Sequence, residues 1–217
     1  MLKEACVETL EQCVRAQKQG ADRIELCANL VQDGLTPSHE LIKLAAEHVE
    51  IPIRVMIRPR AGDFIYSGEE IVQMKKDIDF CRSVGVEGVV FGICTAQGTL
   101  DMEVISELVR HSASLKVTIH KAIDSCSDPV NELVLLKKMA NIHAVLTSGK
   151  AATALEGSGL LRSLVTLAGD DIEVIACGKV TDKNLAEVHQ RIGAQAYHGK
   201  RIVGALDDGE GISTTIL

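Results

Sequence analysis

The 217-residue sequence has few aromatic side chains: it contains no tryptophan, two tyrosines and three phenylalanines. Hydrophobic residues still make up 46% of the chain, so a core must be built mainly from Leu, Ile, Val and Ala. The formal net charge is −7 and no long Lys/Arg run occurs, which argues against nucleic acid or an anionic membrane as a partner. No apolar run reaches the roughly 18 residues that a membrane-spanning helix needs.

Signatures of disulfide frameworks and zinc ribbons are also missing. The cysteine count is odd, at seven, and no C-x-x-C pair occurs. The chain enters a strand-like pattern at Met1 without an apolar signal region. We therefore expect a cytoplasmic protein whose cysteines are thiols. The cysteines are Cys6, Cys13, Cys27, Cys81, Cys94, Cys126 and Cys177.

Eight short β-rich segments alternate with helical patterns along the whole chain. This alternation predicts right-handed crossovers, a parallel sheet and a single (β/α)8 TIM-type barrel domain over residues 1–217. After Arg201 the pattern fades, so the eighth helix should be short or absent and residues 202–217 an irregular tail. The rival fold, a doubly wound open sheet, usually has a glycine-rich turn after its first strand, and Val7-Glu8-Thr9 contains no glycine. The predicted strands are Lys3–Val7, Arg23–Cys27, Ile53–Ile57, Gly88–Phe91, Lys116–His120, Ala144–Thr147, Glu173–Ala176 and Gln195–Tyr197.

Helix starts are signalled by capping residues. Thr9 and Ser67 each precede a Gln or Glu by three positions, as in a capping box. Pro37 and Pro129 are predicted at first helical positions. One further helix is predicted from Thr181 to Ile192.

Strand parity predicts which side chains face the barrel interior. Because the outer face of each strand lies under helices, charged strand residues must point inward. This places a polar set at or near the barrel mouth, where the carboxyl ends of the strands meet. A structural plug of ion pairs among Glu4, Arg23 and Glu25 is the alternative interpretation. The inward set is Glu4, Cys6, Arg23, Glu25, Cys27, Arg58, His120 and His198.

One chemical interpretation of this set is an enzyme site for a small anionic substrate, carboxylate or phosphate. Glu25 and His120 are candidate acid–base groups, and Asp124 could orient His120 or act itself. Arg58 and Arg60 at the end of strand three suit an anion, although Arg60 could equally be a solvated loop residue. The remaining predicted substrate-binding residues are Glu4, Arg23, Ser148, Gly149 and His198.

A second interpretation is a soft-metal site. Cys6 and Cys27 lie on adjacent strands at similar depth, and Met56 lies on the next strand. Thiolate and thioether ligands suit Cu(I), so these three residues could bind a copper ion. The alternative is that they only fill the core, as cysteine and methionine often do.

Seven motifs occur in order along the sequence: Gly20–Leu30, Asp33–Ser38, Val55–Phe64, Gly88–Gly92, Thr118–Asp124, Leu146–Gly149 and Tyr197–Gly199. With these motifs the sequence resembles the CutC family from about residue 2 to residue 200. The resemblance implies a cytoplasmic (β/α)8 barrel that is dimeric or larger and is assigned to copper homeostasis. Three departures stand out: Lys121 follows His120 where the family usually has arginine, Cys177-Gly178-Lys179 replaces a triple glycine, and the tail after Gly199 is short. The last two weigh against an anion site at the seventh and eighth loops.

Overall fold

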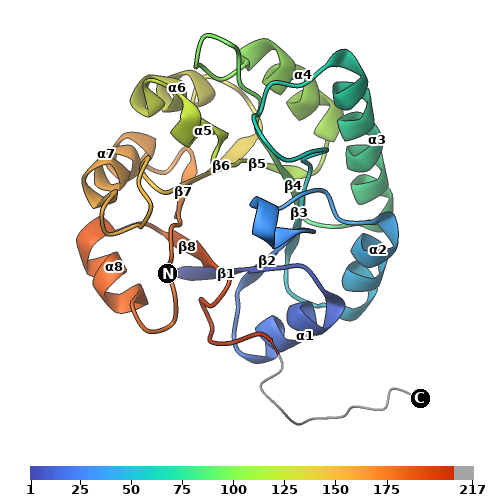
Figure 1. Cartoon of the computed structure of the whole chain (residues 1–217), viewed down its shortest axis with the longest axis horizontal. Helices are drawn as coiled ribbons and strands as arrows, with labels where there is room; N and C mark the ends of the chain where they lie inside the picture. The colour runs from blue at the N-terminus through green and yellow to red at the C-terminus, as the bar shows by residue number, and fades with distance from the viewer. Residues whose placement is uncertain (208–217) are drawn as a thin grey trace.

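The computed structural model of the chain describes residues 1–207 and contains a closed barrel of eight parallel strands. Each strand pairs with its sequence neighbours, and β8 pairs with β1 to close the sheet (Figure 1). The predicted TIM-type barrel is therefore confirmed. The strands are β1 (Leu2–Val7), β2 (Arg23–Leu26), β3 (Ile53–Met56), β4 (Gly88–Phe91), β5 (Lys116–Ile119), β6 (Ile142–Thr147), β7 (Glu173–Ala176) and β8 (Ala196–Gly199).

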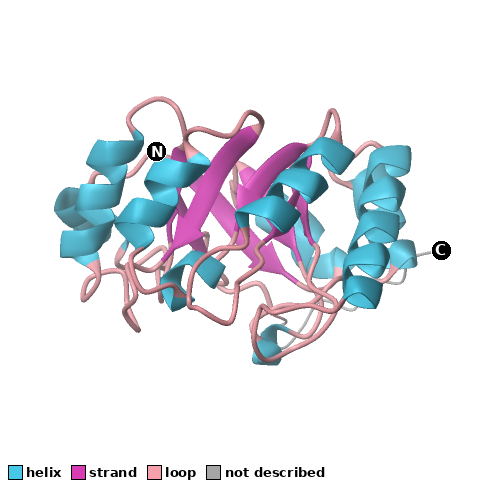
Figure 2. Cartoon of the chain, turned by 90° about the horizontal axis from the view of Figure 1, so that it is seen from above, coloured by secondary structure: helices cyan, strands magenta, loops and turns pink. Residues whose placement is uncertain are grey.

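Helices surround the strands except at the seam between α8 and α1 (Figures 1 and 2). Two helices follow β5, and a 3-10 turn, η1 (Leu30–Gln32), follows β2. The last helix lies between β7 and β8, and none follows β8 up to residue 207, as predicted. The predicted tail lies outside the described residues from position 208 onward. The helices are α1 (Leu10–Lys18), α2 (His39–His48), α3 (Gly68–Val84), α4 (Met102–Ser112), α5 (Ala122–Ser125), α6 (Pro129–Leu136), α7 (Ser158–Ala168) and α8 (Leu185–Ile192).

The segment after β8 occupies the position of the missing eighth helix. Gln12 and Arg15 of α1 hydrogen bond to the side chain and the carbonyl of Asp207, at 2.8 Å each. The Gln19 side chain donates to the carbonyl of Ala205 at 3.2 Å. Leu206 is buried beneath these contacts. The barrel is thus covered at the seam between α8 and α1 without a helix.

Local capping signals set most helix starts. Ser67 and Glu70 form a reciprocal capping box at α3, and Asp128 caps α6 with Pro129 in the first turn, as predicted. The predicted start of α2 at Pro37 is wrong: the Ser38 hydroxyl accepts the Leu41 N–H, so the helix begins at His39.

The predicted start of α8 is also wrong. The Thr181 N–H donates to the side-chain oxygen of Asn184 at 2.8 Å, which forms a turn in place of the first helical residues. The helix therefore begins at Leu185.

The core lies between the sheet and the helices. Outward-facing strand residues such as Ile24, Leu26 and Val55 are fully buried. Burying each such aliphatic side chain contributes about 1.5–3 kcal/mol to folding. The inward-facing residues of the same two strands include the charged Arg23, Glu25 and Arg54, which help to define the interior described next.

Candidate functional site

Ion pairs fill the barrel at the amino-terminal ends of its strands. Arg23, the first residue of β2, hydrogen bonds to Glu4, and its Nη2 lies 2.8 Å from Oε2 of Glu173. Arg54 donates to Glu87 at 3.2 Å and to Thr118 at 2.8 Å. Of the predicted plug, the Arg23–Glu4 pair is formed, whereas Glu25 lies near His198 and pairs with no arginine within residues 1–207. The prediction that Arg23 lies near the mouth is wrong, because a residue that begins a strand lies at the opposite end.

The plug also involves residues that sequence reasoning missed. Arg54 has the same parity as Met56 and Arg58, so parity extended one step further would have found it. Glu173 begins β7 and carries a charge at a strand start, as Arg23 does. A cavity of about 320 Å³ opens at this end, whereas the polar pocket was expected at the mouth. Its lining is Leu2, Asp22, Arg23, Pro52, Arg54, Glu87, Lys116, His143 and Glu173.

Two loops close over the carboxyl end of the barrel. The Arg58 guanidinium is buried and donates to the carbonyls of Gln32 at 2.8 Å, Gly34 at 3.1 Å and Gly62 at 3.0 Å. Arg58 therefore joins the loop after β2 to its own loop after β3. Gly34 has φ +83°, and a Cβ there would lie 3.1 Å from Sγ of Cys27. The loop thus rests directly on the Cys27 thiol.

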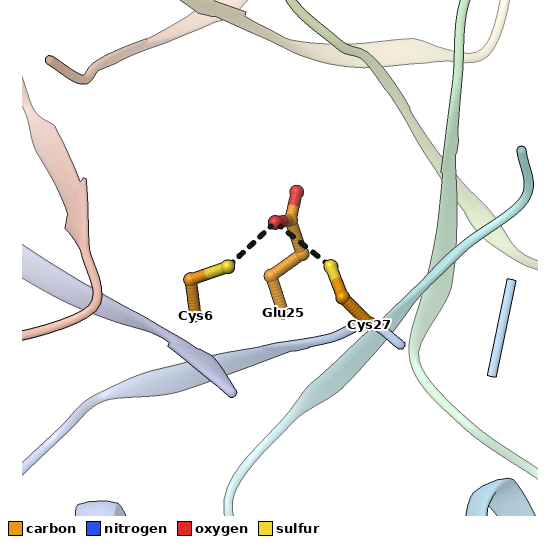
Figure 3. A group of neighbouring side chains, drawn as sticks. All are labelled: Cys6, Glu25 and Cys27. Carbon is orange, nitrogen blue, oxygen red and sulfur yellow. Dashed lines mark hydrogen bonds between the residues drawn. The ribbon is translucent and has the colours of Figure 1, made fainter. Parts of the chain in front are cut away.

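Beneath this loop, two thiols converge on one carboxylate oxygen (Figure 3). Cys6 on β1 lies opposite Glu25 on β2, and Cys27 immediately follows β2. The Sγ atoms of Cys6 and Cys27 each donate to Oε2 of Glu25, at 3.4 Å. The three ligand atoms all lie within 4.8 Å of one another, and the residues are at most 6% exposed. The predicted proximity of the two thiols is therefore present in the structure.

His198 connects this group to Glu4. Its Nδ1 lies 2.9 Å from Oε1 of Glu4, and its Nε2 lies 3.6 Å from Oε2 of Glu25. Burial opposes the charge of His198, but the nearby Glu25 and Cys6 raise its pKa well above the ordinary value. Burial likewise disfavours the charged form of Glu4, but its hydrogen bond to His198 and the charge of Arg23 lower its pKa to about 2. The pair is therefore an imidazolium bonded to a carboxylate.

Glu25 differs from Glu4 in its environment. Burial raises the pKa of Glu25 to about 8, and its Oε1 has no hydrogen-bond partner in the described part of the chain. The neighbouring Cys27 thiol lowers the pKa of Cys6, and the Cys6 thiol raises the pKa of Cys27. The two thiols and the carboxyl with a raised pKa can each release a proton to solvent when a cation binds in their place.

Met56 packs in one apolar cluster with Cys6, Cys27, Leu30 and Val90. The site therefore offers two thiols and an adjacent thioether, all shielded from water, which is the donor set that a soft monovalent cation prefers. These residues fit the predicted copper ligand set chemically.

His120 lies at the end of β5 and is only 3% exposed. Its Nδ1 accepts the Ala122 N–H at 3.1 Å, so the proton of the neutral ring resides on Nε2. Burial first, and then the charge of Arg58, lower the pKa of His120 to about 3. Nε2 has no partner within residues 1–207. His120 is thus a neutral donor in this arrangement, whereas sequence reasoning proposed an acid or base.

Phe64 links His120 to Arg58. Its ring centroid lies 4.8 Å from that of His120, and the Arg58 Cζ lies 5.0 Å from the same ring. The Nε of Arg58 also lacks a hydrogen-bond partner in the described structure. Phe64 was not predicted as a site residue, since an aromatic loop residue carries no periodic signal.

Asp124 anchors a turn and does not orient His120. Its carboxylate accepts hydrogen bonds from the Thr147 hydroxyl, from both the N–H and the hydroxyl of Ser148, and from the N–H of Lys150. The predicted contact between Asp124 and His120 is therefore wrong. The Ser148 hydroxyl is occupied by Asp124. Gly149 has φ +68°, and a Cβ there would lie 2.6 Å from the Gly157 carbonyl.

Arg60 is a solvated loop residue, which was the alternative to its predicted role in anion binding. Its Nε lies 2.7 Å from Glu70 and its Nη2 lies 2.8 Å from Asp63, with 37% of the side chain exposed. The two ion pairs fix the loop after β3 at the protein surface.

Within residues 1–207, no helix is both long enough and apolar enough to cross a bilayer.

Comparison with solved structures returns barrels of the same kind. The CutC protein from Streptococcus agalactiae superposes with a TM-score of 0.88 at 32% identity, over 93% of this chain and 99% of that one. An aldolase named QR15 superposes with a TM-score of 0.67 at 15% identity, over 95% of this chain and 92% of that chain, and shows the fold alone.

Sequence comparison gives closer relatives. A CutC family protein from Mesorhizobium japonicum is 43% identical over 91% of this chain and 76% of its own length. The human protein named copper homeostasis protein cutC homolog is 42% identical over 91% of this chain and 72% of its own length. The sequence profile of the CutC family matches residues 1–203. With these matches and the barrel they share, the chain belongs to the CutC family.

Proposed function

We propose that this protein binds Cu(I) as a cargo ion between Cys6 and Cys27. The observation that carries the proposal is the convergence of the two thiols on one oxygen of Glu25. Human and mouse relatives bear the name copper homeostasis protein, which supports copper as the ion.

The geometry needs little change to hold the ion. Two metal–thiolate bonds of about 2.3 Å span about 4.6 Å, and the ligand atoms of Cys6, Glu25 and Cys27 already lie within 4.8 Å of one another. An ion between the thiols takes the place of the two S–H···O bonds to Glu25. Two thiolates and one Cu(I) carry a net negative charge, which the imidazolium of His198 would offset. Met56 could supply a third, weaker ligand.

An anaerobic titration of Cu(I) against a coloured Cu(I) chelator tests this proposal. Cys6→Ser and Cys27→Ser should each abolish tight binding at this site. Cys177→Ser is the matched control, because Cys177 is also buried among inward-facing residues but lies in a separate cluster. Loss of the same binding in the Cys177 variant, or its retention in both other variants, would contradict the assignment.

A second candidate function is an enzyme pocket for a small carboxylate or other anion at the mouth. The observation that favours it is that two buried donors next to Phe64, Nε2 of His120 and Nε of Arg58, have no hydrogen-bond partner among residues 1–207. An unpaired buried donor is unfavourable, so an acceptor oxygen from a ligand would be stabilised there.

Native mass spectrometry of gently purified protein tests the second function. A copurifying anion that is lost in His120→Phe but retained in His143→Phe would support it. Protein that carries no small molecule and binds none from a metabolite extract would count against it.

We also propose a cytoplasmic location and a homo-oligomeric assembly. The free state of all seven cysteines supports a reducing compartment. Light scattering on the purified protein measures the oligomeric state directly.

A further inference from the structure

A second pair of thiols converges at the barrel mouth, away from Cys6 and Cys27. Cys94 lies in the loop after β4, and Cys126 ends α5. Their Sγ atoms each donate to the carbonyl oxygen of Ala122, at 3.5 Å. Two thiols from different loops therefore share one acceptor.

Both cysteines are held by backbone contacts. The Cys94 N–H donates to the Phe64 carbonyl at 2.9 Å, and Cys94 forms an antiparallel bridge with Leu100. The N–H of Ser127, next to Cys126, donates to the Gly98 carbonyl at 2.8 Å. The loop after β4 is thus fastened to the loop after β3 at Cys94 and to the segment after α5 at Gly98.

The pair differs from the isolated cysteines of the core. Burial raises the pKa of both Cys13 and Cys81 to about 12, and neither has a thiol neighbour that shifts it. The neighbouring Cys126 thiol instead lowers the pKa of Cys94, while Cys94 and burial raise the pKa of Cys126. Cys94 is 8% exposed while Cys126 is fully buried, so an ion would first meet Cys94.

We infer that Cys94 and Cys126 form a second soft-metal site, which takes a two-coordinate monovalent cation of the Cu(I) or Ag(I) type. Binding replaces two S–H bonds with two metal–sulfur bonds and releases two protons to solvent, so no oxidant or reductant is needed. The inference goes beyond the proposed function, because it uses two different cysteines, one in the loop after β4 and one at the end of α5.

A counter-charge for the metal–dithiolate group is already present. The Lys150 ammonium donates to the carbonyl of Cys126 and lies 3.4 Å from that of Ser127. Its positive charge would offset the net negative charge of two thiolates and one monovalent cation.

The second pair is also connected to His120 through one residue. The carbonyl of Ala122 accepts both thiols, and its N–H donates to Nδ1 of His120. Metal binding removes the two S–H donors, so the Ala122 carbonyl loses both of these hydrogen bonds. The amide and imidazole signals of Ala122 and His120 should therefore shift on metal binding, which gives a readout independent of copper stoichiometry.

The test is an anaerobic Cu(I) titration of five reduced proteins, with bicinchoninate as the competing chelator. Unsubstituted protein should bind about two equivalents, and the Cys6→Ser/Cys27→Ser and Cys94→Ser/Cys126→Ser variants about one each. The quadruple variant should bind none. The Cys13→Ser/Cys81→Ser variant is the control and should match the unsubstituted protein.

The outcomes separate the two sites. If Cys6→Ser/Cys27→Ser binds nothing and Cys94→Ser/Cys126→Ser binds like the unsubstituted protein, the second site is overturned and the proposed function stands. If the reverse holds, the proposed function fails and this inference survives. Should Cys94→Ser/Cys126→Ser not fold, alkylation followed by mass spectrometry decides on the Cys6→Ser/Cys27→Ser variant. Copper should protect Cys94 and Cys126 from alkylation but leave Cys13 unaffected, and equal labelling with and without copper would overturn the inference.

Discussion

Replacing Arg23 with methionine should destabilise the barrel by about 3 kcal/mol, because a buried carboxylate would lose its cation. Arg23 and Glu4 are 4% and 1% exposed, and Arg23 also bonds to Glu173. Breaking a buried pair by removing one partner costs about 3–5 kcal/mol. Glu4 keeps His198 as a partner, so the lower end of that range applies.

The pKa of Glu4 gives an independent figure. Its fall from an ordinary value of 4.5 to about 2 corresponds to about 3 kcal/mol, shared between His198 and Arg23. A folded-state pKa below the unfolded value adds stability that is present above about pH 4.5 and is lost as pH falls toward 2. Arg23→Met raises the folded-state pKa, so its stability should decline less than that of the unsubstituted protein as pH falls through this window.

Urea denaturation at pH 7 and at pH 4 measures both effects. The Arg23→Met/Glu4→Gln variant should recover part of the loss at pH 7, because the uncompensated charge is gone. Arg191→Met is the matched control, since the Arg191 pair with Glu187 is exposed. A loss of less than about 1 kcal/mol for Arg23→Met at pH 7 would refute the reasoning, as it would show that water compensates Glu4 in the barrel interior.

Three further predictions follow from single contacts. Gly34→Ala should lower the melting temperature more than Gly169→Ala, since both have positive φ but only the Gly34 Cβ would meet Cys27, at 3.1 Å; equal shifts would contradict the packing of this loop. Asp124→Asn should cost about 1–3 kcal/mol and speed amide exchange at Ser148 and Lys150, because the carboxylate accepts both N–H groups; unchanged exchange rates would show that the turn does not depend on it. The imidazole of His120 should stay neutral and protonated on Nε2 from pH 8 to pH 5 in nitrogen NMR spectra, because its pKa lies near 3; a titration near pH 6.5 would contradict its burial beside Arg58.

The sequence predicted which strand residues face the barrel interior. It predicted less well how far along the barrel axis each of these side chains lies. The inward placement of Glu4, Cys6 and Glu25 follows from alternation, because each outer face must be apolar to pack under helices. Arg23 shares that parity but lies at the other end, since only its position in the strand sets its depth.

Loop contacts could not be predicted in the same way. Arg58 is held by three main-chain carbonyls from two loops, and carbonyl positions leave no trace in residue type. The contacts of Asp124 could not be predicted for the same reason. Its carboxylate accepts hydrogen bonds from main-chain N–H groups of a turn, and every residue except proline has such a group. Helix starts could be predicted more reliably where a capping side chain and its backbone partner lie only a few residues apart, as in the capping box of Ser67 and Glu70.

The segment that covers the seam between α8 and α1 has a consequence for synthesis on the ribosome. Helix α1 is synthesised early, but its residues Gln12 and Arg15 hydrogen bond to Asp207, which is synthesised about 190 residues later. Strand β1 likewise waits for β8 to complete its pairing. At a translation rate of about 5–20 residues per second, the first strand spends on the order of ten seconds as an open sheet edge. The polar and charged side chains of β1, Lys3 and Glu4, would hinder edge-to-edge pairing with other nascent chains during that interval.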